Sequence, residues 1–197
     1  MKKSRFTLLL IVPILLAACD SSGEKQFENL PIAVTLPESQ VVDIDTVISN
    51  AHNEVEKVLP SANLTFFSLV AECEALSDLK GEVHLHFRQT RWSFFGERVF
   101  AARVVVDTVQ QTLSMNVQDE TEQYLSTEPM ELDGMSTLEI AKTLENYLAS
   151  TERCNDRVVL ARGNTAGPWG VRCGPPDEVF IECLEIDSET GRITEQK

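Results

Sequence analysis

The feature that most constrains the fold is an order of secondary structure elements that the sequence predicts twice. In each half of the chain, one amphipathic helix precedes a run of strands in which apolar and polar residues alternate. Such a helix has one apolar stripe and such a strand one apolar face, so the two bury these surfaces against each other. The sequence therefore predicts an α+β fold, with a helix packed on an antiparallel β-meander in each of two modules.

The first predicted module spans residues 43–120. Asp45 can cap its helix, and Pro60 ends it. Apolar and polar residues alternate from Glu82 to Arg91, which indicates a half-buried strand. We expect an apolar helix face of Ile48, Ala51, Val55 and Leu59, and strands at Asn63–Ala71, Glu82–Arg91, Glu97–Asp107 and Thr112–Val117.

The second predicted module spans residues 136–197, after a linker at residues 121–135. Ser136 and Glu139 have the spacing of a capping box, in which each side chain accepts a hydrogen bond from the other residue's backbone N–H. We expect an apolar stripe of Leu138, Ala141, Leu144 and Leu148, strands at about Asp156–Arg162, Pro168–Cys173 and Glu178–Asp187, and a short strand from Ile193.

The two halves align best where an apolar strand ends in aspartate, at residues 104–107 and 184–187. The segment from Phe180 to Ile193 ends a meander in apolar-Asp-x-x-Thr-Gly, which resembles the PepSY-like and cystatin-like modules of secreted bacterial proteins. The resemblance implies that each half is an α+β module of this kind, and the repeated order of elements predicts that the module is duplicated. The first half has Gln110 and Gln111 where the second has its turn glycine, and one irregular α+β domain is the alternative.

Residues 1–18 have the features of a signal peptide. Lys2, Lys3 and Arg5 precede an apolar run from Phe6 to Leu16. A membrane-spanning helix needs about 20 apolar residues, so this run is too short to serve as an anchor. We expect a leader that is cleaved after export.

The leader ends in Leu16–Cys19 (LAAC), which resembles the lipobox of bacterial lipoproteins. The resemblance implies that Cys19 is lipidated, with palmitate among its acyl chains, and that the mature chain begins there. Each buried methylene contributes about 0.8 kcal/mol, so several chains hold the protein on the membrane. Asp20 resembles the signal that retains lipoproteins in the inner membrane of enterobacteria. We therefore expect a lipid-anchored protein on the periplasmic side of the envelope; a plain leader with an incidental Cys19 is the alternative.

Residues 19–42 are expected to form a flexible tether. The segment from Asp20 to Gln26 is polar and cannot bury a core. Pro31 and Pro37 disfavour regular structure further along.

Four cysteines remain beside Cys19: Cys73, Cys154, Cys173 and Cys183. An even number in an oxidising compartment predicts two disulfides. Three pairings are possible, and we favour Cys154–Cys173 between neighbouring strands together with Cys73–Cys183 between the halves. The chain has no CxxC pair, which disfavours thioredoxin-like redox chemistry.

The mature chain is strongly acidic. The full sequence has 17 basic and 31 acidic residues, and the leader holds three of the basic ones and none of the acidic ones, which leaves a formal charge of −17. Nucleic acid binding depends on neutralising phosphates with Lys and Arg, so we expect no nucleic acid partner. The charge favours a cationic partner through long-range attraction, or it simply keeps the surface soluble.

Two predicted hairpin tips carry aromatic residues. The first has Arg91, Trp92, Phe94 and Phe95, and the second has Trp169. Aromatic residues and arginine dominate the contact energy of interfaces and also suit a lipid headgroup layer. We therefore predict partner-binding residues here; packing of the tips within the protein and contact with a membrane are the alternatives.

Catalytic and metal sites find little support. His84 and His86 share one strand face and could hold a metal ion only with a further ligand, so exposed polar residues are the simpler interpretation. The sequence lacks HExxH, GxSxG, GxGxxG and P-loop motifs. We expect no enzyme and no cofactor, but a non-catalytic protein-binding module. A periplasmic inhibitor or immunity protein against a basic enzyme or toxin, and an unrecognised envelope hydrolase, are the alternatives.

Overall fold

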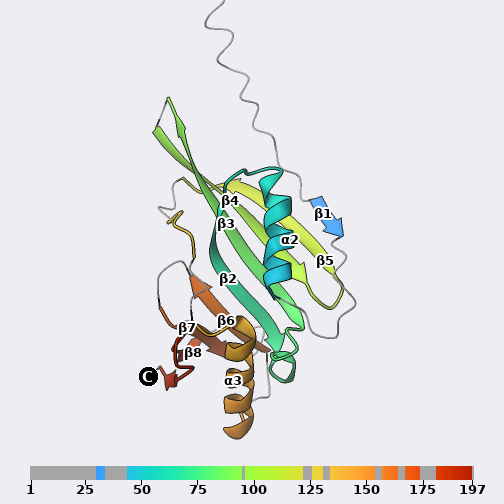
Figure 1. Cartoon of the computed structure of the whole chain (residues 1–197), viewed down its shortest axis with the longest axis vertical. Coiled ribbons are helices and arrows are strands. Elements are labelled where there is room, and N and C mark those ends of the chain that lie inside the picture. The colour runs from blue at the N-terminus through green and yellow to red at the C-terminus, as the bar shows by residue number, and fades with distance from the viewer. Residues whose placement is uncertain are drawn as a thin grey trace, which may run out of the picture.

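A computed structural model describes residues 30–33, 44–94, 96–121, 126–130, 134–153, 157–163, 167–173 and 181–196. Within these residues, two α-helices accompany one nine-stranded antiparallel sheet (Figure 1), which confirms the predicted α+β class. The strand order is β1-β5-β4-β3-β2-β6-β7-β8-β9. The elements are β1 (Leu30–Ala33), α2 (Ile44–Glu56), β2 (Asn63–Glu72), a 3-10 turn η1 (Cys73–Ala75), β3 (Gly81–Ser93), β4 (Gly96–Asp107), β5 (Thr112–Asp119), α3 (Thr137–Ser150), β6 (Arg157–Gly163), β7 (Trp169–Cys173), β8 (Ile181–Ile186) and β9 (Ile193–Glu195).

The two halves of the chain meet in the middle of this sheet. Each half contributes a helix followed by four consecutive strands, and the first strands of the two sets, β2 and β6, pair antiparallel. Leu69 lies opposite Leu160 near the centre of that pair. The two predicted modules therefore share one continuous sheet and one hydrophobic core.

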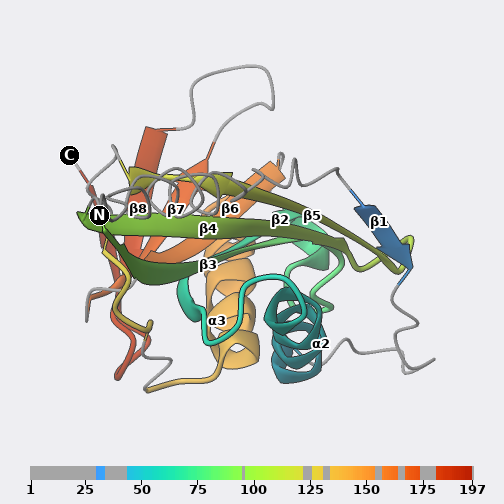
Figure 2. The same ribbon diagram turned by 90° about the horizontal axis from the view of Figure 1, so that it is seen from above.

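Both helices cover the same face of the sheet, as Figure 2 shows. Alternate strand residues point at them and are fully buried, among them Phe67, Leu85 and Leu160. In α2 the buried stripe contains Val47 where we expected Ile48, which is only partly buried. The helix begins at Ile44, so Asp45 lies in its first turn instead of capping it.

The α3 helix starts as the sequence predicts. The backbone N–H of Glu139 donates to Ser136 Oγ at 3.3 Å, and the backbone N–H of Ser136 donates to Glu139 Oε2 at 2.9 Å. This capping box is confirmed. The hydrogen bond from the Ser136 backbone N–H has the largest effect on the pKa of Glu139. Together with the hydrogen bond from the Ser136 side chain, it holds this pKa below its usual value.

The turns that end the two meanders have the same geometry. Asp107 Oδ1 accepts hydrogen bonds from the backbone N–H groups of the second and third residues after it, and Asp187 Oδ1 does the same. The fourth residue after the aspartate has positive φ in both turns, 56° at Gln111 and 69° at Gly191. Gln111 thus adopts the conformation for which the second half uses glycine.

The predicted tether contains an element that the sequence did not predict. Within residues 19–42, Leu30–Ala33 form β1, which pairs with Thr112–Met115 of β5 at the sheet edge. The leader, Cys19, Asp20 and the remaining tether lie outside the described residues. No helix in the described part of the chain has the length and apolar character needed to cross a membrane.

Cys73 and Cys183 are both disulfide-bonded. Cys73 directly follows β2, Cys183 lies in β8, and β6 and β7 run between these strands. Neighbouring strands are about 4.8 Å apart, so the two cysteines are separated by roughly 14 Å. A disulfide spans at most about 7 Å between Cα atoms, so the favoured Cys73–Cys183 pairing is wrong. Cys154 and the side chain of Cys173 lie outside the described residues.

Candidate functional site

The β3–β4 hairpin projects beyond the rest of the sheet (Figure 1). The pairing of β3 with β2 begins at Arg88, and the pairing of β4 with β5 reaches Phe100. Beyond these residues the two strands pair only with each other in the described sheet, up to Ser93 opposite Gly96. Gly96 has φ of 117°, which suits the reversal of the chain at the tip.

The tip of this hairpin presents large aromatic side chains to solvent. Trp92 is 79% exposed and Phe94 is 99% exposed. Arg91 is also exposed, and Phe95 lies outside the described residues. The alternative that this tip packs within the protein is therefore wrong for Trp92 and Phe94. We define the aromatic tip as Arg91, Trp92 and Phe94.

Trp169 does not belong to the contact surface that we predicted. It is 1% exposed, and its ring packs edge-on against Phe67 with centroids 5.7 Å apart. The Arg162 guanidinium lies 5.6 Å from the centroid of its indole ring. The prediction of Trp169 as partner-binding is wrong because β7 turns this side chain, with Val171, toward the helices. The apolar alternation of Trp169 and Val171 in the sequence was the signal for a core position.

Several contacts brace the projecting strands. The guanidinium carbons of Arg91 and Arg98 lie 5.4 Å and 5.6 Å from the ring centroid of Phe100, so two cations flank one aromatic ring. Arg98 Nη2 also donates to Asp119 Oδ2 at 2.6 Å. Arg91 Nε donates to Gln89 Oε1 at 2.7 Å. Among these contacts, Arg98–Asp119 ties the hairpin to β5, and the others link residues within β3 and β4.

A buried ionic cluster lies at the base of the hairpin, on the sheet face opposite the helices. The Glu120 side chain is fully buried. Its carboxylate accepts hydrogen bonds from Arg88 Nε at 3.0 Å, Arg103 Nη2 at 2.6 Å and Gln118 Nε2 at 2.7 Å. Burial alone would raise the pKa of Glu120, but the hydrogen bonds from Gln118, Arg103 and Arg88 together place it below its usual value. Arg88 also donates to Thr65 Oγ1 at 3.1 Å.

Sequence reasoning missed this cluster. The register of the sheet brings Arg88, Arg103 and Gln118 together from β3, β4 and β5, and Glu120 follows β5 directly. A pattern along one strand cannot reveal a cluster built across three strands.

The two histidines lie on the same sheet face as the ionic cluster. Burial and then the positive charges of Arg103 and Arg88 lower the pKa of His86 to about 4. His84 Nε2 lies 3.2 Å from Glu82 Oε2. Within the described residues, no three His, Cys, Asp or Glu side chains gather in a way that could hold a metal ion.

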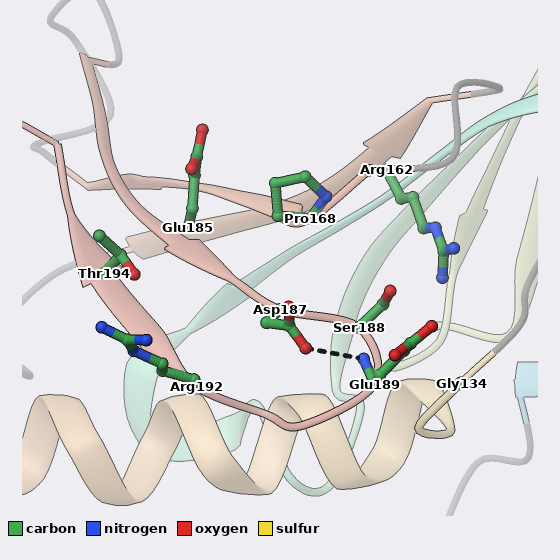
Figure 3. Close-up of a pocket in the computed structure, with 10 residues that line it drawn as sticks. Gly134, Arg162, Pro168, Glu185, Asp187, Ser188, Glu189, Arg192 and Thr194 are labelled. Carbon is green, nitrogen blue, oxygen red and sulfur yellow. Dashed lines mark hydrogen bonds between the residues drawn. The ribbon is translucent and has the colours of Figure 1, made fainter.

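The second half contains a hollow of about 770 Å³ beside the end of β8 (Figure 3). Asp187 in its wall accepts the hydrogen bonds of the β8–β9 turn, including the one from Glu189 shown in Figure 3. Glu185 points away from Asp187 in the same view. The wall thus combines charges of both signs. The Asp187 carboxylate in it already accepts the hydrogen bonds that hold the β8–β9 turn. Other lining residues are Gly134, Arg162, Pro168, Arg192 and Thr194.

Comparison with known proteins does not assign this site. The chain matches no protein-family model, no curated protein and no solved structure. The resemblance to PepSY-like and cystatin-like modules and the lipobox therefore stay predictions. The aromatic tip is the feature of the described residues that most clearly departs from what folding alone requires.

Proposed function

We propose that this chain is a lipid-anchored protein of the bacterial envelope that contacts another component of the envelope through its projecting hairpin and catalyses no reaction. The observation that carries the proposal is the aromatic tip, exposed at the end of a hairpin that projects from the sheet. We propose that Arg91, Trp92 and Phe94, with Phe95 beside them in the sequence, make the contact.

The projecting hairpin has features of a contact surface. A partner that covers exposed aromatic residues removes their apolar surface from water, which favours binding. The entropy cost is small because these side chains have few rotatable bonds. A two-stranded ribbon is only marginally stable alone. The braces at Phe100 and Asp119 therefore support a segment that contributes little to the core.

The polar groups of the described chain offer less support for catalysis. Asp187 in the hollow holds a turn, and Gly134 approaches the Ser188 carbonyl so closely that a Cβ atom there would lie 2.2 Å from it. Glu120 is saturated by its arginine and glutamine donors. These groups are committed to structure, which favours binding over chemistry.

The cysteines support an extracytoplasmic location. Disulfides such as those of Cys73 and Cys183 persist in oxidising compartments. Cys73 follows Glu72, which pairs with Arg157, and Cys154 precedes Arg157 by three residues. Because β6 separates Cys73 from β7, we propose the pairs Cys73–Cys154 and Cys173–Cys183.

We also propose that the two halves arose by duplication. Each contains a helix and four strands in the same order, and the halves meet at their first strands. The shared turn geometry after Asp107 and Asp187 supports this relation.

A double substitution at the aromatic tip tests the proposed contact. After crosslinking in native envelopes, Trp92→Ala with Phe94→Ala should abolish the adducts, with lipid or protein, that are recovered by a pull-down of the lipidated chain. Val109→Ala is the matched control, because Val109 is 66% exposed at the β4–β5 turn, away from the tip. Equal recovery with the double variant would contradict the proposal.

The charge of −17 favours a second candidate, an inhibitor or immunity protein against a basic enzyme or toxin. Charge-steered association slows steeply as salt rises, whereas aromatic contact responds weakly to salt. Association rates measured at low and physiological salt therefore separate the two candidates.

A further inference from the structure

We infer that the aromatic tip rests in the headgroup layer of the phospholipid membrane to which Cys19 would be anchored. The inference deepens the proposed function, because it rests on the lipid anchor and names the partner of the same tip. It is carried by the position of β1 relative to the hairpin and by the chemistry of the tip.

The chain enters the sheet from the end at which the hairpin projects. Leu30 opens β1 and lies opposite Met115, which in turn lies opposite Val104 of β4. From that level β4 continues back toward the tip, and β1 runs away from it (Figure 1). Leu30, the residue to which the tether is joined, therefore lies at the tip-side end of β1.

The lengths agree with contact at one surface. About eight residues separate Val104 from Gly96, so the tip extends ~26 Å beyond the level of Leu30 at ~3.3 Å per residue. About 11 residues separate Cys19 from Leu30, and fully extended they span at most ~40 Å. If the end-to-end distance of the tether is less than about two thirds of its extended length, the tip reaches the membrane.

The side chains of the tip suit the boundary between headgroups and acyl chains. Tryptophan is enriched at that boundary because its ring is apolar and its N–H polar. Arginine beside it can donate to lipid phosphates. Phe94 is 99% exposed, so burial among lipids would remove a large apolar surface from water.

Charge distribution favours this orientation of the molecule. The mature chain carries −17 overall, which repels the body of the protein from anionic lipids. At the tip Arg91 is exposed, and Arg98 is paired with Asp119, so only Glu97 opposes it locally. The charges of Arg91, Glu97, Arg98 and Asp119 sum to zero, so an anionic membrane repels the tip less than it repels the chain as a whole.

The two tryptophans of the chain allow a direct test. Trp92 is 79% exposed and Trp169 is 1% exposed, so only Trp92 can reach lipid. The lipidated full-length protein is placed in vesicles of phosphatidylethanolamine and phosphatidylglycerol, with and without brominated acyl chains. We expect the tryptophan emission to shift to shorter wavelength, to lose intensity with brominated lipids and to resist quenching by iodide.

Two variants assign the signal. Trp169→Phe should keep the loss of emission, because it leaves Trp92 as the reporter, and Trp92→Phe should remove it. If Trp169→Phe fails to fold, the wild-type protein can be used in its place. Trp169 is buried, so any loss of emission caused by brominated lipids still comes from Trp92.

The outcomes separate the inference from the proposed function. Vesicle flotation reports the lipid anchor, and a chain that does not float contradicts both. A chain that floats while Trp92 stays quenchable by iodide and unaffected by brominated lipids overturns the inference alone. Protection of Trp92 in native envelopes but not in vesicles would also overturn it and would identify a protein as the partner.

Discussion

Among single residues, those of the buried ionic cluster at the base of the hairpin should matter most for stability. Glu120 is the only acidic side chain in the described part of the cluster, and it faces Arg88 and Arg103 without contact to water. Removing one member of a buried ion group leaves the remaining charges unpaired, which usually destabilises more than the group itself stabilises. The cluster is therefore where a single substitution should have the largest effect.

The substitution Glu120→Gln keeps the size of the side chain and removes its charge. Because Arg88 is nearly buried beside it, we expect a loss of about 3 kcal/mol in the free energy of unfolding. Urea denaturation measures this loss. Glu128→Gln, at an exposed position, is the control and should change nothing; equal urea midpoints for the two variants would contradict the role of Glu120.

His86 should make stability depend on pH. Its pKa is about 4 in the folded protein and about 6.5 in the unfolded chain, so only the unfolded chain takes up the proton between these values. Stability should therefore be complete above pH 6.5 and fall as pH decreases toward 4. In His86→Gln the fall between pH 6.5 and 4.5 should become smaller, as urea unfolding at both pH values would show; an unchanged fall would contradict this account.

At the scale of secondary structure elements, the sequence predicted most of what the chain forms. The period of the apolar residues placed α3 and the four strands of the first meander close to their observed bounds, because each element buries a face of its own. It missed β1, because four residues with Pro31 have no strand signal without the β5 edge beside them.

The candidate site was predictable in part. The first hairpin tip stood out because three large aromatic residues, Trp92, Phe94 and Phe95, interrupt a turn in which small polar residues are usual. Trp169 looked similar, yet its exposure depends on which face of β7 packs on the helices. The Glu120 cluster depends on the register of three strands, which local patterns do not fix.

The two meander turns make a prediction about backbone strain. Gly191 has φ of 69°, and a Cβ atom there would lie 2.8 Å from Met135 Sδ, so Gly191→Ala should destabilise by about 1 kcal/mol or more. Gly163→Ala is the control, because no atom lies within 4 Å of its Cβ position. Thermal unfolding compares the two variants, and equal melting temperatures would contradict the turn assignment.

At the scale of the whole molecule, the sheet order limits the covalent links between the halves. With β6 and β7 between Cys73 and Cys183, each of these cysteines needs another partner. Proteolysis of the non-reduced protein followed by mass spectrometry should find Cys73 linked to Cys154 and Cys173 linked to Cys183. A peptide that joins Cys73 to Cys183 would contradict the strand order.

The most direct measurement of the central claim uses a photo-crosslinking amino acid in place of Phe94 in living cells. The account predicts an efficient adduct at this position, with lipid as its first expected product, and little or none when the same amino acid replaces Val109, which is also exposed. Equal labelling at the two positions, or none at residue 94, would contradict the claim that the hairpin tip is where this protein makes its contact.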